Sequence, residues 1–488
     1  MHDFLIFLAV TVFIFVPLTI GITISLENRS PHKTISWLLV LMFLPGVGFL
    51  LYLIFGANTR KHRWENAKAR IVAYLNHADM REILDAAEAL PVADDPADSK
   101  LFDLADQNTM RLVLNSGVSP LTVRNKVDIY TDGVAKFAQM LEDIKNAREH
   151  IHLEYYIIRK SSVADELRAA LISKANEGVK VRIIYDDWGS WKLKKDPEFI
   201  LSLKKAGCEV YTTIKPRFPF GIRDFNYRDH RKICVIDGKI GYVGGINIAD
   251  EYIHKGKLGY WRDTHLRIQG AAVYMLQMIF AIGWMLRTDE MLLGRAYFPT
   301  DVENTGESMI QIAASGADTP QETIYQAYFY AIAQAKNTVY IETPYFIPDE
   351  SILTALKAAA MAGVDVRIIF PQKSDHATVH EASLSYLEEL MRLGAKVYFY
   401  QKGFIHSKML LVDNEMASVG TANMDIRSFM LNSEINAFIY DKETVGRLYR
   451  VFADDLTDCR QAKKAEVTQK FLPQRIWRSV CRLFSPVL

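Results

Sequence analysis

The sequence predicts an α/β protein in which a two-helix transmembrane anchor precedes two tandem copies of one α/β unit. Three observations lead there: two long uncharged runs near the N-terminus, a residue set that recurs at a constant interval, and strand-helix-strand patterns in both copies. With 488 residues, the chain is too long for one ordinary domain. We expect five segments: the anchor at 1–60, a helical linker at 61–120, the two units at 121–300 and 301–465, and a basic amphipathic helix at 466–488.

The two uncharged runs extend from Phe4 to Leu26 and from Thr34 to Thr59. Each exceeds the roughly 20 apolar residues that a helix needs to cross a bilayer. A cleaved signal peptide is the alternative for the first run, but no basic segment precedes it and its apolar core is too long. We therefore expect a hairpin of two membrane-spanning helices.

Basic residues near the two runs predict which side of the membrane the rest of the chain occupies. The short connecting loop carries Arg29 and Lys33, whereas a larger basic group follows the second run: Arg60, Lys61, Arg63, Lys68 and Arg70. Because basic residues favour the cytoplasmic side, we expect the large C-terminal body to face the cytoplasm.

Composition narrows the function classes. There are 58 basic and 57 acidic residues, a formal net charge of +1, which argues against a nucleic-acid-binding protein. The four cysteines are widely scattered and form neither a disulfide framework nor a zinc motif: Cys208, Cys234, Cys459 and Cys481.

An internal repeat dominates the body of the chain. Each member of the first set recurs 176 positions later: His230, Lys232, Asp237, Gly244 and Asn247 become His406, Lys408, Asp413, Gly420 and Asn423. Upstream, strand-like stretches containing Glu154 and Glu342 also correspond, and each is followed by a helical pattern and another strand. This is the order of a sheet covered by helices, present twice.

The repeated residues predict one composite site for a phosphodiester. Residues two apart on a strand share a face, so each copy presents a histidine and a lysine together. Two copies meeting across a pseudo-two-fold axis place two histidines, two lysines and two asparagines around one substrate. One histidine attacks phosphorus, the other exchanges protons with the leaving and incoming alcohols, and the lysines neutralise the phosphoryl oxygens. We expect no metal and no cofactor, because no acidic or histidine cluster has ligand spacing and two lysines repel a cation.

Acidic residues near the motifs divide into two kinds. Asp237 and Asp413 belong to the repeated catalytic motif but end its strands in turns, so we expect them to act through local geometry. Asp263 and Glu434 follow their histidines by 33 and 28 positions, and we expect each to orient the histidine that precedes it. The alternative is that both are ordinary surface acids.

The repeated motifs and the stretches around them resemble a known family. The paired His-x-Lys motifs, each followed by an aspartate and a glycine, resemble the phospholipase D superfamily. Four further stretches are similar to bacterial cardiolipin synthases: Asn226–Lys232, Gly244–Tyr252, Trp261–Asp263 and Gly420–Phe429. The resemblance implies two phospholipase D-like α/β sandwich domains with pseudo-two-fold symmetry in the bacterial cytoplasmic membrane.

The resemblance also implies an activity. Phosphatidylglycerol would form a phosphatidyl-histidine and release glycerol, and a second phosphatidylglycerol would resolve the intermediate into cardiolipin. By the same resemblance, His230 is the nucleophile and His406 the acid and base; the near-symmetric repeat does not separate them. Alternatives are a hydrolytic phospholipase D, another phosphatidyltransferase such as a phosphatidylserine synthase, a nuclease, and a non-catalytic scaffold.

Two features outside the motifs suit a lipid substrate. The insertion Lys215–Arg223 before His230 is basic and aromatic, and either contacts lipid or forms a solvated loop. Near the C-terminus, apolar residues fall on one helical face with arginines beside them: Ile476, Val480, Leu483 and Phe484, with Arg475, Arg478 and Arg482. Such a helix either lies on an anionic membrane or packs on the protein body. The sequence does not predict an oligomeric state.

Overall fold

The computed structural model describes most of the chain. It covers residues 21–22, 31–52, 56, 60–82, 107–116, 119–213, 226–299, 306–316, 319, 321–468 and 471–485. The chain divides into two compact units, Met1–Arg63 with Ile214–Tyr227, and Trp64–Thr213 with Arg228–Leu488. The predicted first membrane helix, apart from Gly21 and Ile22, and the insertion 215–223 lie outside the described residues.

Among its described residues, the first unit includes the short helices α3 (Pro31–Phe43) and α4 (Pro45–Leu51). Leu44 has non-helical backbone angles and Pro45 begins α4, so the predicted second run is not one continuous helix. The two helices pack around Leu41, Trp37 and Tyr52. The rings of Trp37 and Tyr52 meet edge to face, with their centroids 5.4 Å apart. In the part of the chain that the structure describes, no helix has the length and apolar character needed to cross a membrane.

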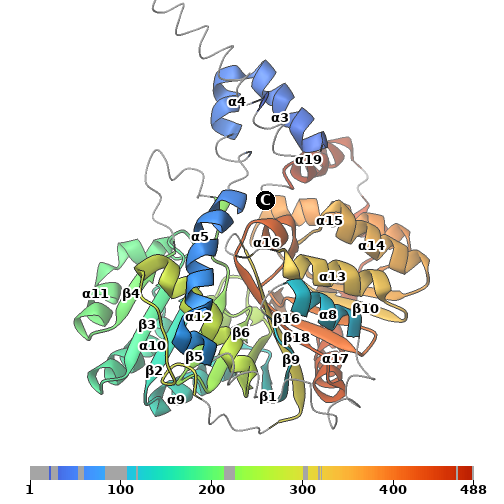
Figure 1. Cartoon of the computed structure of the whole chain (residues 1–488). Helices are drawn as coiled ribbons and strands as arrows, with labels where there is room; N and C mark the ends of the chain where they lie inside the picture. Colours follow the sequence, from blue (N-terminus) through green and yellow to red (C-terminus); the bar gives the residue numbers. More distant parts are fainter. Residues whose placement is uncertain are drawn as a thin grey trace, which may run out of the picture. The chain divides into compact units, whose positions relative to one another are not determined.

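The second unit is built on one continuous sheet (Figure 1). Among the described residues it has 15 strands in the order β19-β13-β12-β10-β15-β16-β18-β9-β1-β8-β6-β5-β2-β3-β4. The first half supplies β1 (Thr122–Tyr130), β2 (His150–Tyr155), β3 (Lys180–Tyr185), β4 (Glu209–Thr212), β5 (Lys232–Ile236), β6 (Ile240–Gly244) and β8 (His265–Gln269). The second half supplies β9 (Ser308–Ser315), β10 (Thr338–Glu342), β12 (Asp365–Pro371), β13 (Lys396–Tyr400), β15 (Met409–Val412), β16 (Met416–Gly420), β18 (Glu434–Ile439) and β19 (Cys459–Gln461).

Strand order repeats outward from the central antiparallel pair of β1 and β9. From β1 the first half continues through β8, β6, β5, β2, β3 and β4, and from β9 the second continues through the equivalent β18, β16, β15, β10, β12 and β13. This order is the one that a pseudo-two-fold relation predicts. Because the halves share one sheet, the fold does not test the predicted domain boundaries at 121 and 301. These boundaries, and the one at 466, stay predictions.

Helices cover both faces of each half. One face of the first half packs against α9 (Gly133–Asn146), α10 (Ser162–Asn176) and α11 (Pro197–Lys205). The corresponding face of the second half packs against α8 (Gln107–Ser116), α13 (Thr323–Gln334), α14 (Glu350–Met361) and α15 (Ala377–Arg392). A third apolar core joins the halves around α12 (Ala272–Thr288) and α17 (Lys442–Thr457), with α5 (Arg60–Leu75) against it. The all-round apolar surface of α12 fits this central place.

Side-chain caps explain where several helices begin. Asp132, Asp349 and Asp441 accept backbone hydrogen bonds in the first turns of α9, α14 and α17, and Ser161 does so for α10. Smaller elements complete the second unit: α16 (Ile426–Met430), α18 (Lys464–Val467), α19 (Leu472–Leu483), and the 3-10 turns Trp191–Lys195 and Asp250–Ile253.

Two short parallel pairs lie outside the main sheet, β7 (Tyr260–Arg262) with β14 (Gly403–Ile405) and β11 (Phe346–Ile347) with β17 (Met424–Asp425). The first pair joins the two halves of the second unit.

Candidate active site

His230 is held where the two halves meet. It lies two residues before β5, and its backbone N–H donates to the carbonyl of Ser433 in the second half, at 2.8 Å. Ser433 in turn donates its N–H to the carbonyl of Arg228 at 2.8 Å. The His230 side chain is buried, and the ring of Tyr156 meets it edge to face with centroids 4.9 Å apart.

His406 occupies the equivalent place in the second half. Its backbone N–H donates to the carbonyl of Arg262 at 2.7 Å, extending the parallel pairing of β7 with β14. Its buried ring lies 5.5 Å from that of Trp261 and 5.7 Å from that of Tyr252, both from the first half. Each histidine is therefore positioned by the backbone of the other half.

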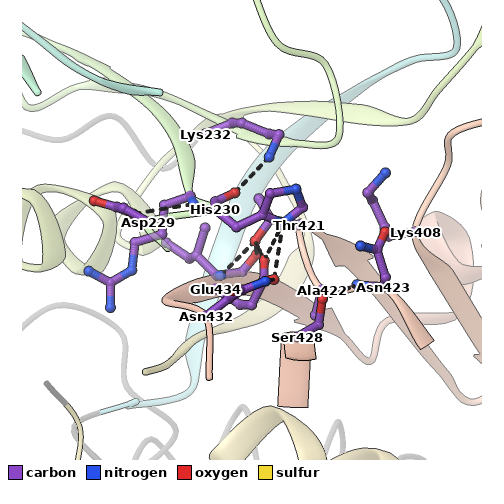
Figure 2. Close-up of polar contacts among 12 residues, drawn as sticks. Asp229, His230, Lys232, Lys408, Thr421, Ala422, Asn423, Ser428, Asn432 and Glu434 are labelled. Carbon is purple, nitrogen blue, oxygen red and sulfur yellow. Dashed lines mark hydrogen bonds and ion pairs between the residues drawn. The ribbon is translucent and has the colours of Figure 1, made fainter. Parts of the chain in front are cut away.

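The two predicted acids do contact the histidines, but in the opposite pairing. Glu434 lies against His230, with its oxygens 2.9 and 3.0 Å from Nδ1, as Figure 2 shows. Asp263 lies against His406, with Oδ2 2.7 Å from Nδ1. The prediction that each acid orients the histidine preceding it was wrong. The cause is the way the halves meet: the parallel pairing of β7 with β14 and the parallel bridge of Asp229 with Ser433 bring the start of β18 beside His230 and the end of β7 beside His406.

Both acids are fixed by further hydrogen bonds that the sequence did not reveal. Thr421 donates its hydroxyl to Oε2 of Glu434 at 2.6 Å (Figure 2). The backbone N–H of Thr264 donates to Oδ1 of Asp263 at 2.8 Å. Thr421 lies inside the Gly420–Phe429 stretch and Thr264 directly follows Trp261–Asp263, so the motifs themselves were the signal that could have identified both threonines.

Lys232 and Lys408 lie beside the histidines, as their i and i+2 spacing predicted. Lys232 donates from Nζ to the carbonyl of His230 at 2.6 Å, and Lys408 donates to the carbonyl of His406 and lies 2.8 Å from its Nδ1. Both lysines are buried. Burial lowers the pKa of Lys232 to about 7 and that of Lys408 to about 8.

Electrostatic coupling crosses between the halves. Burial lowers the pKa of His230, while Glu434 opposes this shift and Lys408 of the other half adds to it. Burial, then Lys408 and Lys232, lower the pKa of His406 well below its ordinary value. The charges of each half thus act on the imidazole of the other, so the two halves form one composite site.

The pKa values of Asp263 and Glu434 shift in opposite directions. Burial raises the pKa of Asp263 to about 6, with Lys408 opposing. Burial also acts to raise the pKa of Glu434, but attraction to His230 and Lys232 outweighs it and the pKa falls below its ordinary value. Glu434 is therefore the more firmly ionised partner at neutral pH.

Asn247 and Asn423, predicted as equivalent amide donors, have different surroundings. The side chain of Asn247 accepts from the N–H of Ile157 at 3.1 Å and donates to the hydroxyl of Tyr252. Asn423 is buried and directly precedes β17, and its Oδ1 has no hydrogen-bond partner among the described residues. Contact of either asparagine with substrate stays a prediction.

Asp237 and Asp413 are separated from the histidines by the length of a strand. Asp237 accepts from the N–H groups of Arg148, Glu149 and His150 at 2.8 to 2.9 Å, and Asp413 accepts from Lys336, Asn337 and Thr338 at 2.7 to 2.8 Å. Both residues have positive φ, 53° and 54°, in the turns that the sequence predicted. Including them among the catalytic residues was wrong, because at about 3.3 Å per residue β5 alone spans about 13 Å between Lys232 and Ile236. Their expected geometric role agrees with these contacts.

Two buried ion-pair groups flank the site. Arg262 forms a bidentate pair with Asp455 of the second half, from Nε to Oδ1 at 2.8 Å and from Nη2 to Oδ2 at 2.5 Å, with Glu342 at 3.8 Å. Arg231 lies 3.8 Å from Glu154. Burial raises the pKa of both glutamates, that of Glu342 to about 8. The repeated glutamates in the sequence were the signal for these groups.

Among residues that the structure describes, no group of three or more histidine, cysteine, aspartate or glutamate side chains is arranged to hold a metal ion.

Family models match most of the body and the N-terminal segment. The model described as "Cardiolipin synthase, PLD-like domain" matches residues 140–256 and 328–456, one match in each half. A model described as "Phospholipase_D-nuclease N-terminal" matches residues 5–56.

Curated relatives are similar over nearly the whole chain. A cardiolipin synthase of Geobacillus sp. (strain WCH70) is 44% identical over 473 residues, 96% of this chain and 91% of that protein. The major cardiolipin synthase ClsA of Bacillus subtilis (strain 168) is 44% identical over 476 residues, 96% of each.

Among solved structures, phosphatidylserine synthase of Haemophilus influenzae Rd KW20 superposes with a TM-score of 0.60. It covers 78% of this chain and all of that one at 15% identity, and so supports the fold alone. The family matches and the full-length relatives carry the assignment. The chain belongs to the bacterial cardiolipin synthases of the phospholipase D superfamily.

Proposed function

We propose that the chain is a cardiolipin synthase that transfers a phosphatidyl group from one phosphatidylglycerol to the terminal hydroxyl of another, releasing glycerol. The observation that carries the proposal is the pair of buried histidines, each hydrogen-bonded through Nδ1 to a carboxylate and each accompanied by a buried lysine. The similarity to curated cardiolipin synthases over 96% of the chain supports the choice of lipid substrate.

In the first step, Nε2 of one histidine attacks phosphorus. Hydrogen bonding of Nδ1 to the carboxylate keeps the proton on Nδ1 and leaves the lone pair on Nε2. A phosphorus–nitrogen bond forms, the phosphorus–oxygen bond to glycerol breaks, and the second histidine gives its proton to the departing oxygen. The family resemblance assigns the attack to His230 and the proton transfer to His406.

In the second step, the neutral second histidine takes the proton of the incoming hydroxyl. The oxygen of the second phosphatidylglycerol then attacks phosphorus and the phosphorus–nitrogen bond breaks, which restores both histidines. Lys232 and Lys408 stabilise the negative charge on the phosphoryl oxygens throughout.

Membrane attachment forms part of the proposal. The uncharged runs 4–26 and 34–59 would anchor the chain in the bacterial cytoplasmic membrane, with the catalytic body on the cytoplasmic side, where phosphatidylglycerol and other anionic lipids lie. The match of an N-terminal family model to residues 5–56 and the basic residues after Thr59 support it. Protease added to intact spheroplasts should leave the body uncut, and digestion of the body there would reverse the orientation.

The deciding experiment supplies the purified chain with phosphatidylglycerol, free serine and excess chelator in mixed micelles and resolves the lipids by mass spectrometry. We expect cardiolipin and glycerol, with turnover unaffected by the chelator. Phosphatidic acid as the main product would indicate a hydrolase, and phosphatidylserine a different transferase.

The site assignment is tested with His230→Ala and His406→Ala, each expected to abolish turnover. His77→Ala, at an exposed histidine on another part of the chain, is the matched control and should retain it. Near-normal turnover in either site variant would reject the composite site.

A further inference from the structure

The C-terminal helix α19 is attached to the body through its basic side. Arg478 donates from Nε to Glu381 at 3.1 Å and lies 3.7 Å from Glu388, and Arg482 pairs with Glu389. These three glutamates belong to α15. The side chains of Arg478 and Cys481 are buried in this contact, and Ser485 accepts a hydrogen bond from Tyr386 at 3.0 Å.

The other side of the helix is apolar and exposed. Six large apolar residues in and next to α19 are between 50% and 79% exposed: Phe471, Leu472, Ile476, Trp477, Leu483 and Phe484. At 100° per residue, Leu472, Ile476 and Leu483 fall within about 40° of one another, and Phe484 and Trp477 widen this strip to about 140°. The apolar strip and the paired arginines therefore occupy opposite sides of one short helix.

The position of α15 connects this strip to the catalytic end of the sheet. α15 begins just after Asp375, whose charge acts on the pKa of both His406 and Lys408. Near its first turns, Ser383 accepts from the N–H of Phe346 in β11, and β11 pairs with β17, which follows Asn423 directly. α19 thus packs on the helix that borders the second half of the site.

We propose that α19 lies along the surface of the lipid bilayer that holds the substrate, with its apolar strip inserted among the acyl chains and its arginine side on α15. This inference depends on the proposed function, because a lipid-metabolising site next to the strip is the reason for choosing a bilayer over a protein partner. The exposed Trp477 at the edge of the strip suits the interfacial zone.

The contacts also determine which force holds the helix there. Of the three arginines of α19, Arg478 and Arg482 are already paired with glutamates of α15 and contribute little attraction to anionic headgroups, which leaves the exposed Arg475 as the main basic contributor. Insertion depends on the apolar strip, so contact of α19 with lipid is expected to change little with salt. This differs from the adsorption of a basic helix that the sequence alone suggests.

The test uses the full chain in vesicles of phosphatidylglycerol and phosphatidylcholine, with photoreactive benzoylphenylalanine in place of Leu483. Leu201 is the matched control site: it is an exposed leucine (47%) on α11, which precedes β4 at the other end of the strand order from β13, the strand that follows α15. We expect lipid adducts at position 483 at least fivefold more abundant than at 201, in low salt and in 0.5 M salt alike.

Each other result rejects the proposal. Equal yields at the two positions would mean that the strip faces water. Adducts with a second chain would make it a self-association surface, and adducts with residues 1–56 of the same chain would make it a docking surface for the N-terminal segment. Loss of the lipid adduct in high salt would replace insertion by electrostatic adsorption.

A functional readout separates this inference from the proposed activity. The double variant Ile476→Ser/Leu483→Ser should keep its unfolding midpoint and its turnover of short-chain phosphatidylglycerol in detergent, but show an apparent KM on vesicles raised at least threefold. Unchanged vesicle kinetics would reject the role of α19. Absence of cardiolipin from the parent chain would instead reject the proposed function and leave the crosslinking result standing.

Discussion

The Nδ1 atom of His230 lies 2.9 Å from the carboxylate of Glu434, although 204 positions separate the two residues in the chain. The reciprocal pair, His406 with Asp263, spans 143 positions at 2.7 Å. Each half therefore supplies a histidine to the site and an acid to the histidine of the other half. Orientation of both imidazoles depends on how the halves meet.

Glu434→Gln and Asp263→Asn should each lower kcat by about 10²- to 10⁴-fold with little change in KM, because an amide no longer holds the proton on Nδ1 or stabilises the imidazolium. Steady-state kinetics on phosphatidylglycerol micelles measures this. Glu142→Gln, a change of the same kind at an exposed glutamate of α9, serves as control and should stay within about twofold. A variant of either site acid that retains full kcat would contradict the cross-half pairing.

The pH dependence of kcat/KM should be bell-shaped with a narrow optimum. Asp263, with a pKa of about 6, is ionised above that pH and loses its charge as the pH falls through it. Lys232 and Lys408, with pKa values of about 7 and about 8, are charged below those values and lose their attraction for phosphate as the pH rises through them. Activity should therefore fall on both sides of about pH 6 to 7.

An arginine substitution identifies the alkaline limb. Lys232→Arg keeps its charge across this range, so whatever activity remains should decline only near pH 8, where Lys408 still titrates. A pH profile that is unchanged in this variant would assign the limb to another group.

Asp237→Ala should destabilise the fold by about 2–4 kcal/mol, because three backbone N–H groups lose a charged acceptor at once. Turnover per folded molecule should stay within a few-fold of the parent, since Asp237 lies a strand length from His230. Thermal unfolding and kinetics on the same preparation measure both effects, and Asp413→Ala repeats the test in the second half. Lost turnover with an unchanged unfolding midpoint would restore Asp237 to the catalytic residues.

Asp455→Ala should destabilise the protein by about 3–5 kcal/mol, because it leaves the buried guanidinium of Arg262 without its bidentate partner. It should also lower kcat, since Arg262 directly precedes Asp263. The neighbouring exposed Asp454→Ala is the matched control. Replacing both partners, in Arg262→Met/Asp455→Leu, should recover much of the stability; if the double variant is as unstable as Asp455→Ala, the pair is not the cause.

Much of this arrangement could be predicted from the sequence. The 176-residue interval predicted equivalent strands, the spacing of His230 and Lys232 predicted that both lie at one strand end, and Asp237 with Gly238 predicted the turn after β5. These are local patterns, and local backbone geometry decides them. The repeat also predicted a composite site, because a duplicated unit brings equivalent strand ends together.

What could not be predicted depends on contacts between the halves. Sequence distance favoured Asp263 for His230, but the pairing of β7 with β14 and of Asp229 with Ser433 reverses that choice. Asn247 and Asn423 have equal positions in the repeat, yet the hydroxyl of Tyr252, whose counterpart 176 positions later is Ser428, accepts a hydrogen bond from the amide of Asn247. The break at Pro45 shows a similar limit, since an uncharged run has the same composition whether or not the helix continues through it.

The exchange of acids between the halves has a consequence for how such a chain can arise and be divided. A single copy of the unit would carry a histidine whose acid is absent and an acid with no histidine to orient, so it would be inactive alone and would acquire both only in a homodimer. The present chain is in this sense a dimer made permanent by a peptide connection. Its two halves can diverge in sequence, as Asp263 and Glu434 have done, only while each continues to fit the other.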